Sequence, residues 1–372
     1  MRFDRDRQRR APVRRSSLFD GIPSPFVNQP EHRAASAKKS CWTDILATTP
    51  DRRPQKFGVV LLPDFSLVGF SLAIEPLRAA NAASDRDLYR WTLLSVDGAA
   101  VTASNGIAVK PEQSLAKSEE FDAVIVIGGA GSERVNDGRI LGFLRRTARM
   151  GTPLGAISTA PYVLARAGLL NGRRCTIHWD YLDSLSQEYP DLETTNELFV
   201  MDGPVATCCG EAAAIDLMLY LIGAQYGHEL AAEVSEQFIY KKIRDAREHQ
   251  RMNLRSRLGT SNPRLLAAVH KMEENLETPL EREDVAEAVH VSTRQLERLF
   301  RKHLNSTPRK YYFRLRIQRA RTLLRQTSMS VLDVAVACGF NSASHFSACY
   351  RDFFGHSPRQ ERASRIDMVR PA

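Results

Sequence analysis

The sequence has no apolar run that approaches the roughly 18 residues needed to span a bilayer. Its first stretch, Met1 to Arg15, is rich in arginine but lacks the apolar core of a secretory signal, and Asp4 and Asp6 argue against an organelle transit peptide. The six cysteines are scattered without CxxC spacing, so neither a zinc site nor a disulfide framework is predicted. These absences predict a cytoplasmic protein with reduced thiols, no membrane anchor and no metal site.

Charge is distributed unevenly along the 372 residues. The net charge is +6 over residues 1–55, −9 over 56–239, +5 over 240–262 and +7 over 263–372. Basic segments attract polyanions because binding releases counterions, although charged runs are often only solvated surface. The length suits two domains with tails. The basic segments make nucleic acid one candidate partner. The sequence motifs must decide between nucleic-acid binding and a merely solvated surface.

Residues 1–55 combine Arg, Pro, Ser and Gln without a sustained period, which predicts a disordered basic arm. Over residues 56–239, apolar runs typical of buried strands alternate with helical stretches such as the one near 137–150. Continuous apolar strands separated by helices predict an α/β sandwich with a parallel sheet covered on both faces. The four clearest strand-like runs are KFGVVLLP (56–63), RWTLLSVDG (90–98), FDAVIVIGG (121–129) and PLGAIS (153–158).

The last third of the chain is expected to be wholly helical. Basic residues 240–262, with Gly and Asn among them, predict a linker, and the Asn-Pro pair at 262–263 predicts the start of a helix. Residues 263–362 are predicted to form an all-α domain, followed by a tail at 363–372.

An internal repeat of about 50 residues is the strongest signal in the sequence. VAEAVHVSTRQLERLFRKHLNSTPRK (285–310) matches VAVACGFNSASHFSACYRDFFGHSPRQ (334–360), so that Leu296 aligns with Phe346 and Phe300 with Tyr350. Each copy predicts a short helix, a turn and a second helix whose apolar residues recur at i, i+3 or i+4. Two helix-turn-helix units are therefore predicted.

The exposed face of each second helix carries side chains that can reach base edges and phosphates in a major groove. Ser292, and either Ser342 or Asn341, are expected N-caps. Helix 313–326 lies between the copies and carries an arginine-rich face, so it would fix the distance between the two reading helices. The candidate DNA-binding residues are Arg294, Gln295, Arg298, Arg301, Asn341, Ser342, Ser344, His345, Ser347 and Arg351.

Residues 263–362 resemble the AraC/XylS DNA-binding domain, whose signature matches the stretch from Ser330 through GFNSASHFSACYRDFFGHSPR to Glu361. The alternative is a helical protein-interaction domain with solvated arginines. Two repeat copies joined by a basic helix disfavour it.

Residues 56–239 resemble the PfpI-like, class I glutamine amidotransferase-like domain of GlxA-type regulators, which implies a flavodoxin-like sheet. The resemblance rests on LLPDFSLVGFSLAIEPLRAAN (61–81), VIVIGG followed by AG (124–131), LGAISTAPYVLARAGLLNGRRCTIHW (154–179) and CCGEAAAIDLMLYLI (208–222). Catalytic relatives place a cysteine at a strand-to-helix elbow, where this chain has Ser158, and Ala160 replaces the usual glycine. Serine needs a base to become nucleophilic, so loss of hydrolase activity is expected.

The elbow remains a predicted ligand site, because helical N–H groups near Thr159 and the amides of residues 128–131 would hold a carboxylate. The resemblance also implies that an acidic residue, Glu75, lies near this pocket. A carboxylate together with aromatic rings could hold an ammonium group. An ordinary surface acid and a core tryptophan are the plain alternatives for Glu75 and Trp179. The candidate ligand residues are Glu75, Gly129, Ala130, Ser158, Thr159, His178 and Trp179. SVDG (95–98) and residues 165–179 also resemble the GbdR-like branch, which implies a betaine-type or carnitine-type ligand.

Together these features predict a sequence-specific DNA-binding regulator of the AraC family, an activator controlled by an amino-acid-derived or quaternary ammonium metabolite. It would have no catalytic residues and no cofactor. Its expected partners are double-stranded DNA, the small-molecule effector, RNA polymerase and a second copy of the chain, with residues 211–239 as a candidate dimer surface. The alternatives are an amidase or protease that uses Ser158 and carries a DNA-binding tail, and a nucleoid-type binder with little sequence preference.

Overall fold

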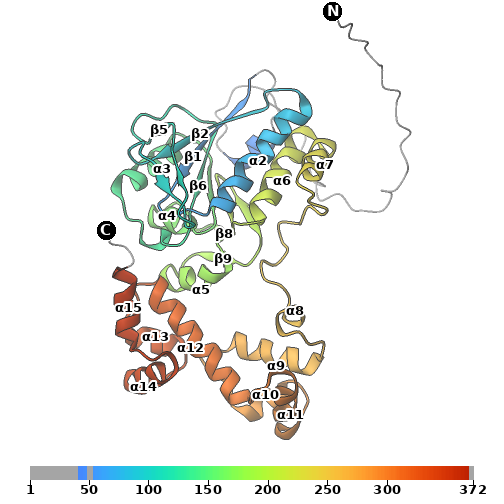
Figure 1. Cartoon of the computed structure of the whole chain (residues 1–372), viewed down its shortest axis with the longest axis vertical. Helices are drawn as coiled ribbons and strands as arrows, with labels where there is room; N and C mark the ends of the chain where they lie inside the picture. The colour runs from blue at the N-terminus through green and yellow to red at the C-terminus, as the bar shows by residue number, and fades with distance from the viewer. Residues whose placement is uncertain (1–40, 48–52, 368–372) are drawn as a thin grey trace, which may run out of the picture. The chain divides into compact units, whose positions relative to one another are not determined.

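The computed structural model describes residues 41–47 and 53–367 of the chain, with an α/β portion first and a helical portion after it (Figure 1). Within these two stretches no helix is both long enough and apolar enough to cross a membrane.

The α/β portion is built on a seven-stranded sheet with the order β10-β11-β7-β6-β1-β2-β5. Neighbouring strands are parallel except β10 and β11, which pair antiparallel. The predicted parallel sheet is therefore confirmed, with one antiparallel edge strand. The strands are β1 (Gln55–Leu61), β2 (Tyr89–Ser95), β5 (Gln113–Ser114), β6 (Ala123–Ile127), β7 (Leu154–Ile157), β10 (Phe199–Asp202) and β11 (Val205–Cys208); β3 (Val101–Thr102) pairs with β4 (Ala108–Val109), and β8 (Arg174–Thr176) with β9 (Glu193–Thr195).

Helices cover both faces of this sheet (Figure 1). Successive residues of a strand point to opposite faces, so Val59 packs in one core while Val60 packs in the other. This is why the strands read as continuous apolar runs. The first face is covered by α1 (Trp42–Ala47), α2 (Leu67–Ser84), α6 (Ala213–Tyr226) and α7 (His228–Gln237); the second is covered by α3 (Gly138–Arg149), α4 (Pro161–Arg166) and α5 (Trp179–Glu188), and the short helix η1 (Ser132–Arg134) follows β6.

The expectation of a disordered arm over residues 1–55 is wrong for Trp42–Ala47, which form α1. Trp42 and Ile45 are fully buried in the first core, and Trp42 Nε1 donates to the carbonyl of Leu154 at 2.9 Å. One large apolar side chain with a satisfied N–H thus fixes a segment whose composition resembles a disordered arm. Residues 1–40 and 48–52 of that arm lie outside the described residues.

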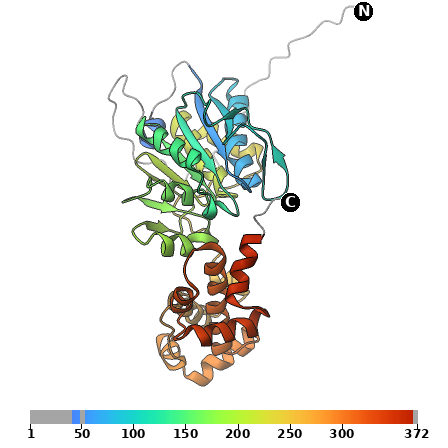
Figure 2. The same cartoon turned by 90° about the vertical axis from the view of Figure 1, so that its left-hand side faces the viewer.

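Every regular element of the C-terminal portion is a helix (Figure 2). Two apolar cores lie here, one around Leu296 and Phe300 and the other around Phe346 and Tyr350, as the repeat predicts. The long helix α12 contributes to both cores. The helices are α8 (Leu254–Leu258), α9 (Pro263–Glu274), α10 (Arg282–Ala288), α11 (Thr293–Leu304), α12 (Pro308–Gln326), α13 (Val331–Ala337), α14 (Ala343–Phe354) and α15 (Pro358–Asp367).

The arginines of α12 hold the second repeat in place. Arg316 donates to the carbonyl of Cys338 at 2.8 Å and Arg319 donates to the carbonyl of Ala337 at 2.6 Å, where α13 ends. Arg321 and Arg325 lie 3.1 Å and 2.6 Å from the carboxylate of Glu361, which is buried. These side chains fasten α12 to the second helix-turn-helix unit, so the two repeats are joined by a rigid element.

Candidate DNA interface and ligand cavity

The second helix of each repeat begins with a serine cap. Ser292 Oγ accepts from the backbone N–H of Gln295 at 3.2 Å, and Ser342 Oγ accepts from that of His345 at 3.2 Å. Ser342 rather than Asn341 is therefore the cap of α14. Capping fixes where each helix starts, and hence which side chains stand in its first turns.

The predicted DNA-reading side chains lie on the outer faces of α11 and α14 or just before α14. The buried residues of these two helices, Leu296, Phe300, Phe346 and Tyr350, face the cores. Among the candidates Ser347 is half-buried, and the others are exposed: Arg294, Gln295, Arg298, Arg301, Asn341, Ser342, Ser344, His345 and Arg351.

The exposed arginines differ in how free they are to reach DNA. Arg301 lies 3.5 Å from Glu297, whereas within the described residues Arg294 and Arg298 form no ion pair. Gln295 already uses its Oε1 to accept from the Ser292 backbone N–H at 2.9 Å. Arg294 and Arg298 are thus more available than Arg301 for phosphate or base contacts.

The strand-to-helix elbow predicted at Ser158 is present in the α/β portion. Ser158 follows β7 with a φ of 65°, in the left-handed region that non-glycine residues seldom adopt. Gly210 makes the elbow possible, because a Cβ there would lie 2.6 Å from Ser158 Cα. The elbow lies at the carboxyl ends of β7 and β11, which are adjacent because these strands pair in parallel.

The predicted carboxylate cradle is occupied by the protein's own groups. The amides of Gly128, Gly129 and Gly131 donate to Ile157 O at 3.1 Å, Ser132 Oγ at 3.1 Å and Glu133 Oε2 at 3.0 Å. Thr159 Oγ1 donates to the carbonyl of Gly129 at 2.5 Å. Because α4 begins at Pro161, which has no N–H, and is only six residues long, it adds little to anion binding.

The elbow also lacks the features of an activated nucleophile. Within the described residues no hydrogen bond joins Ser158 Oγ to a histidine or a carboxylate, as a serine nucleophile would need. Burial raises the pKa of Cys175 to about 11 and raises that of Cys208 well above its ordinary value. Neither of these thiols therefore supplies a reactive thiolate near neutral pH.

A cavity of about 180 Å³ lies beside the elbow. Two of the predicted ligand residues, His178 and Trp179, line it at the start of α5. Glu75 does not: it is partly exposed on α2 and lies 2.7 Å from Arg78, so the structure places it on the surface. The full lining is His178, Trp179, Leu198, Cys209, Gly210, Glu211, Ala212, Ala213, Arg244 and Gln250.

The cavity combines one carboxylate with aromatic and donor groups. Glu211 has a φ of 50°, and its Oε2 accepts from Ser66 Oγ at 3.0 Å. Burial lowers the pKa of His178, against the opposing effects of Asp180 and Glu211, so this imidazole is neutral near pH 7. Arg244 lies 2.7 Å from the buried carboxylate of Asp216.

Glu211, Arg244 and Gln250 were not predicted as ligand residues. Glu211 had a usable signal, because it follows β11, and ligands bind at the carboxyl ends of parallel strands. Arg244 and Gln250 had no such sequence signal, because no spacing rule links the basic segment after α7 to a cavity formed by β11 and α5.

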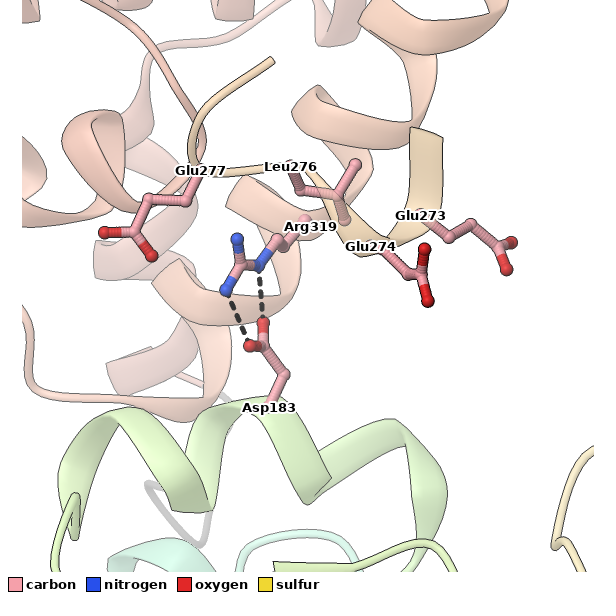
Figure 3. Close-up of a pocket in the computed structure, with 6 residues that line it drawn as sticks. All are labelled: Asp183, Glu273, Glu274, Leu276, Glu277 and Arg319. Carbon is pink, nitrogen blue, oxygen red and sulfur yellow. Dashed lines mark hydrogen bonds and ion pairs between the residues drawn. The ribbon is translucent and has the colours of Figure 1, made fainter. Parts of the chain in front are cut away.

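A second cavity, of about 340 Å³, is dominated by acidic side chains (Figure 3). Its lining consists of Asp183, Glu273, Glu274, Leu276, Glu277 and Arg319. Asp183 of α5 accepts two hydrogen bonds from Arg319 of α12, both at 2.7 Å. The only cation of the lining is thus already paired, and we assign this cavity no ligand.

Family models match both parts of the chain. The DJ-1/PfpI family model matches residues 56–224, and a helix-turn-helix domain model matches residues 285–364. The fold and the paired reading helices therefore define a DNA-binding transcription regulator with a DJ-1/PfpI domain.

Similar proteins specify the family further. The HTH-type transcriptional regulator GbdR of Pseudomonas aeruginosa is 46% identical over 84% of this chain and 85% of its own length. The regulator CdhR of the same organism is 47% identical over 83% of this chain and 92% of its own, and GlxA of Rhizobium meliloti is 36% identical over 84% and 97%. The chain belongs to this family of HTH-type transcriptional regulators, which confirms the predicted GlxA-type architecture. These relatives are regulators, so the chain is a DNA-binding regulator and not an enzyme.

Proposed function

We propose that this regulator is an activator whose action on DNA is controlled by a small amino-acid-derived or quaternary ammonium metabolite bound beside the elbow. The observation that carries the proposal is the cavity of about 180 Å³ in which Glu211 and Trp179 lie together. A carboxylate and an indole attract an ammonium group through charge and through the ring's negative face. The neutral imidazole of His178 adds no repulsion to a bound cation.

The other polar groups of the cavity favour a zwitterion. Arg244 brings its guanidinium group to the cavity, and N–H groups of this kind bind carboxylates. The volume suits a compact ligand, because a cavity of about 150 Å³ holds a molecule the size of benzene. The predicted ligand residues Gly129, Ala130, Ser158 and Thr159 would then support the elbow behind the cavity rather than bind the ligand through their amides.

The remaining partners follow from regulation of transcription. A homodimer would double the contacts with DNA, and helices α6 and α7 remain the candidate dimer surface. An activator must also contact RNA polymerase, and a chromosomal regulator of this kind would act in the cytoplasm. Ligand binding would shift the population of arrangements that are competent for DNA or polymerase contact.

The test is thermal unfolding of the full chain against a panel of betaines, carnitine, methylglycines and basic amino acids. A compound at a hundred times its Kd adds about 2.7 kcal/mol, which raises Tm by a few degrees. One compound should raise Tm selectively, and Trp179→Ala should remove that shift without changing the Tm of the unliganded protein. The matched control is Trp91→Phe, on strand β2 and outside the cavity lining.

The absence of a shift across the whole panel would contradict the proposed class of effector. An equal response of Trp179→Ala and the unmodified protein to the same compound would instead show that the ligand binds elsewhere. Analytical ultracentrifugation of the full chain tests the dimer separately, because a monomer at micromolar concentration would contradict it.

A further inference from the structure

The segment between α7 and α8, residues 240–253, is fastened to the α/β portion along much of its length; we call it the connector. At its start, Arg244 and Tyr240 surround the buried carboxylate of Asp216: the Arg244 backbone N–H lies 2.8 Å and the Tyr240 hydroxyl 3.0 Å from Oδ1. Further along, the carbonyl of Ala246 accepts from the Leu198 N–H at 2.9 Å. A flexible linker has no such fixed contacts.

The connector also supplies part of the cavity wall, through Arg244 and Gln250. Gln250 Nε2 donates to Thr176 Oγ1, to the carbonyl of Ile177 and to that of Glu197, at 2.9, 2.9 and 3.0 Å. Its Oε1 is buried, and no donor among the described residues reaches it. A buried acceptor without a donor is costly, so a bound N–H or O–H group at this place would be favourable.

Trp179 links the cavity to the next residue of the connector. The indole lines the cavity, and the guanidinium carbon of Arg251 lies 4.6 Å from its ring centroid. Burial lowers the pKa of Arg251, and the nearby Arg257 lowers it further. A ligand that changes the position of this indole therefore changes the contact that holds Arg251.

The connector leads directly into the DNA-binding portion. Leu254 and Leu258 of α8 pack against the core of the first repeat, and Arg257 lies 2.6 Å from Glu273 of α9. Only four residue steps separate Gln250 from Leu254, a span of at most about 14 Å. Because this span is short, a displacement of Gln250 at the cavity wall should also move α8.

We propose that the connector is one wall of the effector site and reports its occupancy to the DNA-binding portion through the contact between Trp179 and Arg251. This inference rests on the proposed function, because it concerns the regulation of the same cavity. Gln250 contributes to effector binding, whereas Arg251 transmits the result. The two roles predict different phenotypes for substitutions only one residue apart.

The test uses the full chain, an operator fragment selected by the protein from random DNA, and two probes: glycine betaine and L-arginine. Tm shifts report binding of each probe, and operator Kd with and without the probe reports coupling. Gln250→Ala should weaken binding of L-arginine about tenfold, because its hydrogen bond to Gln250 Oε1 is lost, whereas glycine betaine, which has no N–H or O–H group, should bind with nearly unchanged affinity. Arg251→Ala should keep the probe-induced Tm shift but reduce the change in operator Kd to less than twofold, from the 5-fold or more typical of coupled sites.

Arg247→Ala is the matched control, because Arg247 is an exposed connector residue outside the cavity lining. It should behave as the unmodified protein does in both measurements. Gln250→Met, which is close to glutamine in size, is the second variant if Gln250→Ala lowers the Tm of the unliganded protein. If the probe changed the operator Kd of Arg251→Ala as much as that of Arg247→Ala, the proposed role of the connector would be overturned.

If neither probe raises Tm, these two compounds are not the effector, and operator affinity without a probe tests the connector on its own. Arg251→Ala should then change operator Kd about fivefold or more relative to Arg247→Ala. Equal affinities would overturn the inference even though the proposed function could still hold for another compound. Failure of the effector class and failure of the connector are thus distinguished.

Discussion

Replacing the buried carboxylate of Glu361 should strongly destabilise the second helix-turn-helix unit. Its side chain is 1% exposed and accepts hydrogen bonds from Arg325 at 2.6 Å, Tyr350 at 2.8 Å and Arg321 at 3.1 Å; His356 Nε2 lies 2.6 Å away. Burial alone would raise the pKa of Glu361, but the hydrogen bonds, from His356 first, outweigh it and lower the pKa to about 2. α12, α14 and α15 meet at this one side chain.

The magnitude follows from linkage between protonation and folding. A folded pKa of about 2 against an ordinary value of 4.5 corresponds to about 3 kcal/mol of stability near pH 7. Because the folded pKa is depressed, this stability is present above pH 4.5 and is lost as the pH falls toward 2. Glu361→Gln should therefore destabilise this unit by about 2–3 kcal/mol near neutral pH.

The assay is denaturant unfolding of the full chain, with hydrogen exchange of peptides from residues 331–363 as the local readout. The difference in free energy of unfolding between Glu361→Gln and the unmodified protein should narrow by about 1 kcal/mol between about pH 5 and about pH 3.5. The control is Glu274→Gln, which removes an exposed carboxylate of α9 and should have little effect. A difference that is small at pH 7, or that does not change over this range, would refute the reasoning.

Two further substitutions test the reading helices and the elbow. Arg298→Ala should weaken operator binding by about 1–3 kcal/mol, and more than Arg301→Ala does, because Arg301 already lies near a glutamate; equal losses in operator Kd titrations would contradict the assigned roles. Gly210→Ala should lower the free energy of unfolding by about 2–4 kcal/mol, because its φ is 88° and the new methyl group would collide with Ser158. Gly106→Ala has the same strain (φ of 85°) but meets nothing within 4 Å, so chemical denaturation should show a clearly smaller loss; similar losses would rule out the steric argument.

The helical portion could be predicted closely because its information is local and repeated. The repeat aligned Leu296 with Phe346 and Phe300 with Tyr350, and all four side chains are buried in equivalent cores. The cap at Ser292 was readable for the same reason, since a cap depends on residues three positions apart. Periodicity and capping are properties of short segments, which a single sequence displays directly.

The cavity was only partly predictable because its walls come from distant segments. His178 and Trp179 were found through the family resemblance, but the same resemblance favoured Glu75 over Glu211, although Glu211 follows a strand of the parallel sheet. The contact between Arg244 and Asp216 joins residues 28 positions apart, and no pattern in the basic segment predicts this contact. Trp42 shows the same limit, since one buried indole outweighed the composition of its surroundings.

The measurement that tests the central claim most directly is the operator affinity of the full chain with and without the panel compound that raises its Tm. Effector control through the α/β portion predicts sequence-specific binding whose Kd changes fivefold or more when the compound is added, and a change that Trp179→Ala abolishes. Tight, sequence-specific binding that no stabilising compound alters would contradict that control and would leave a DNA-binding regulator without the proposed sensor.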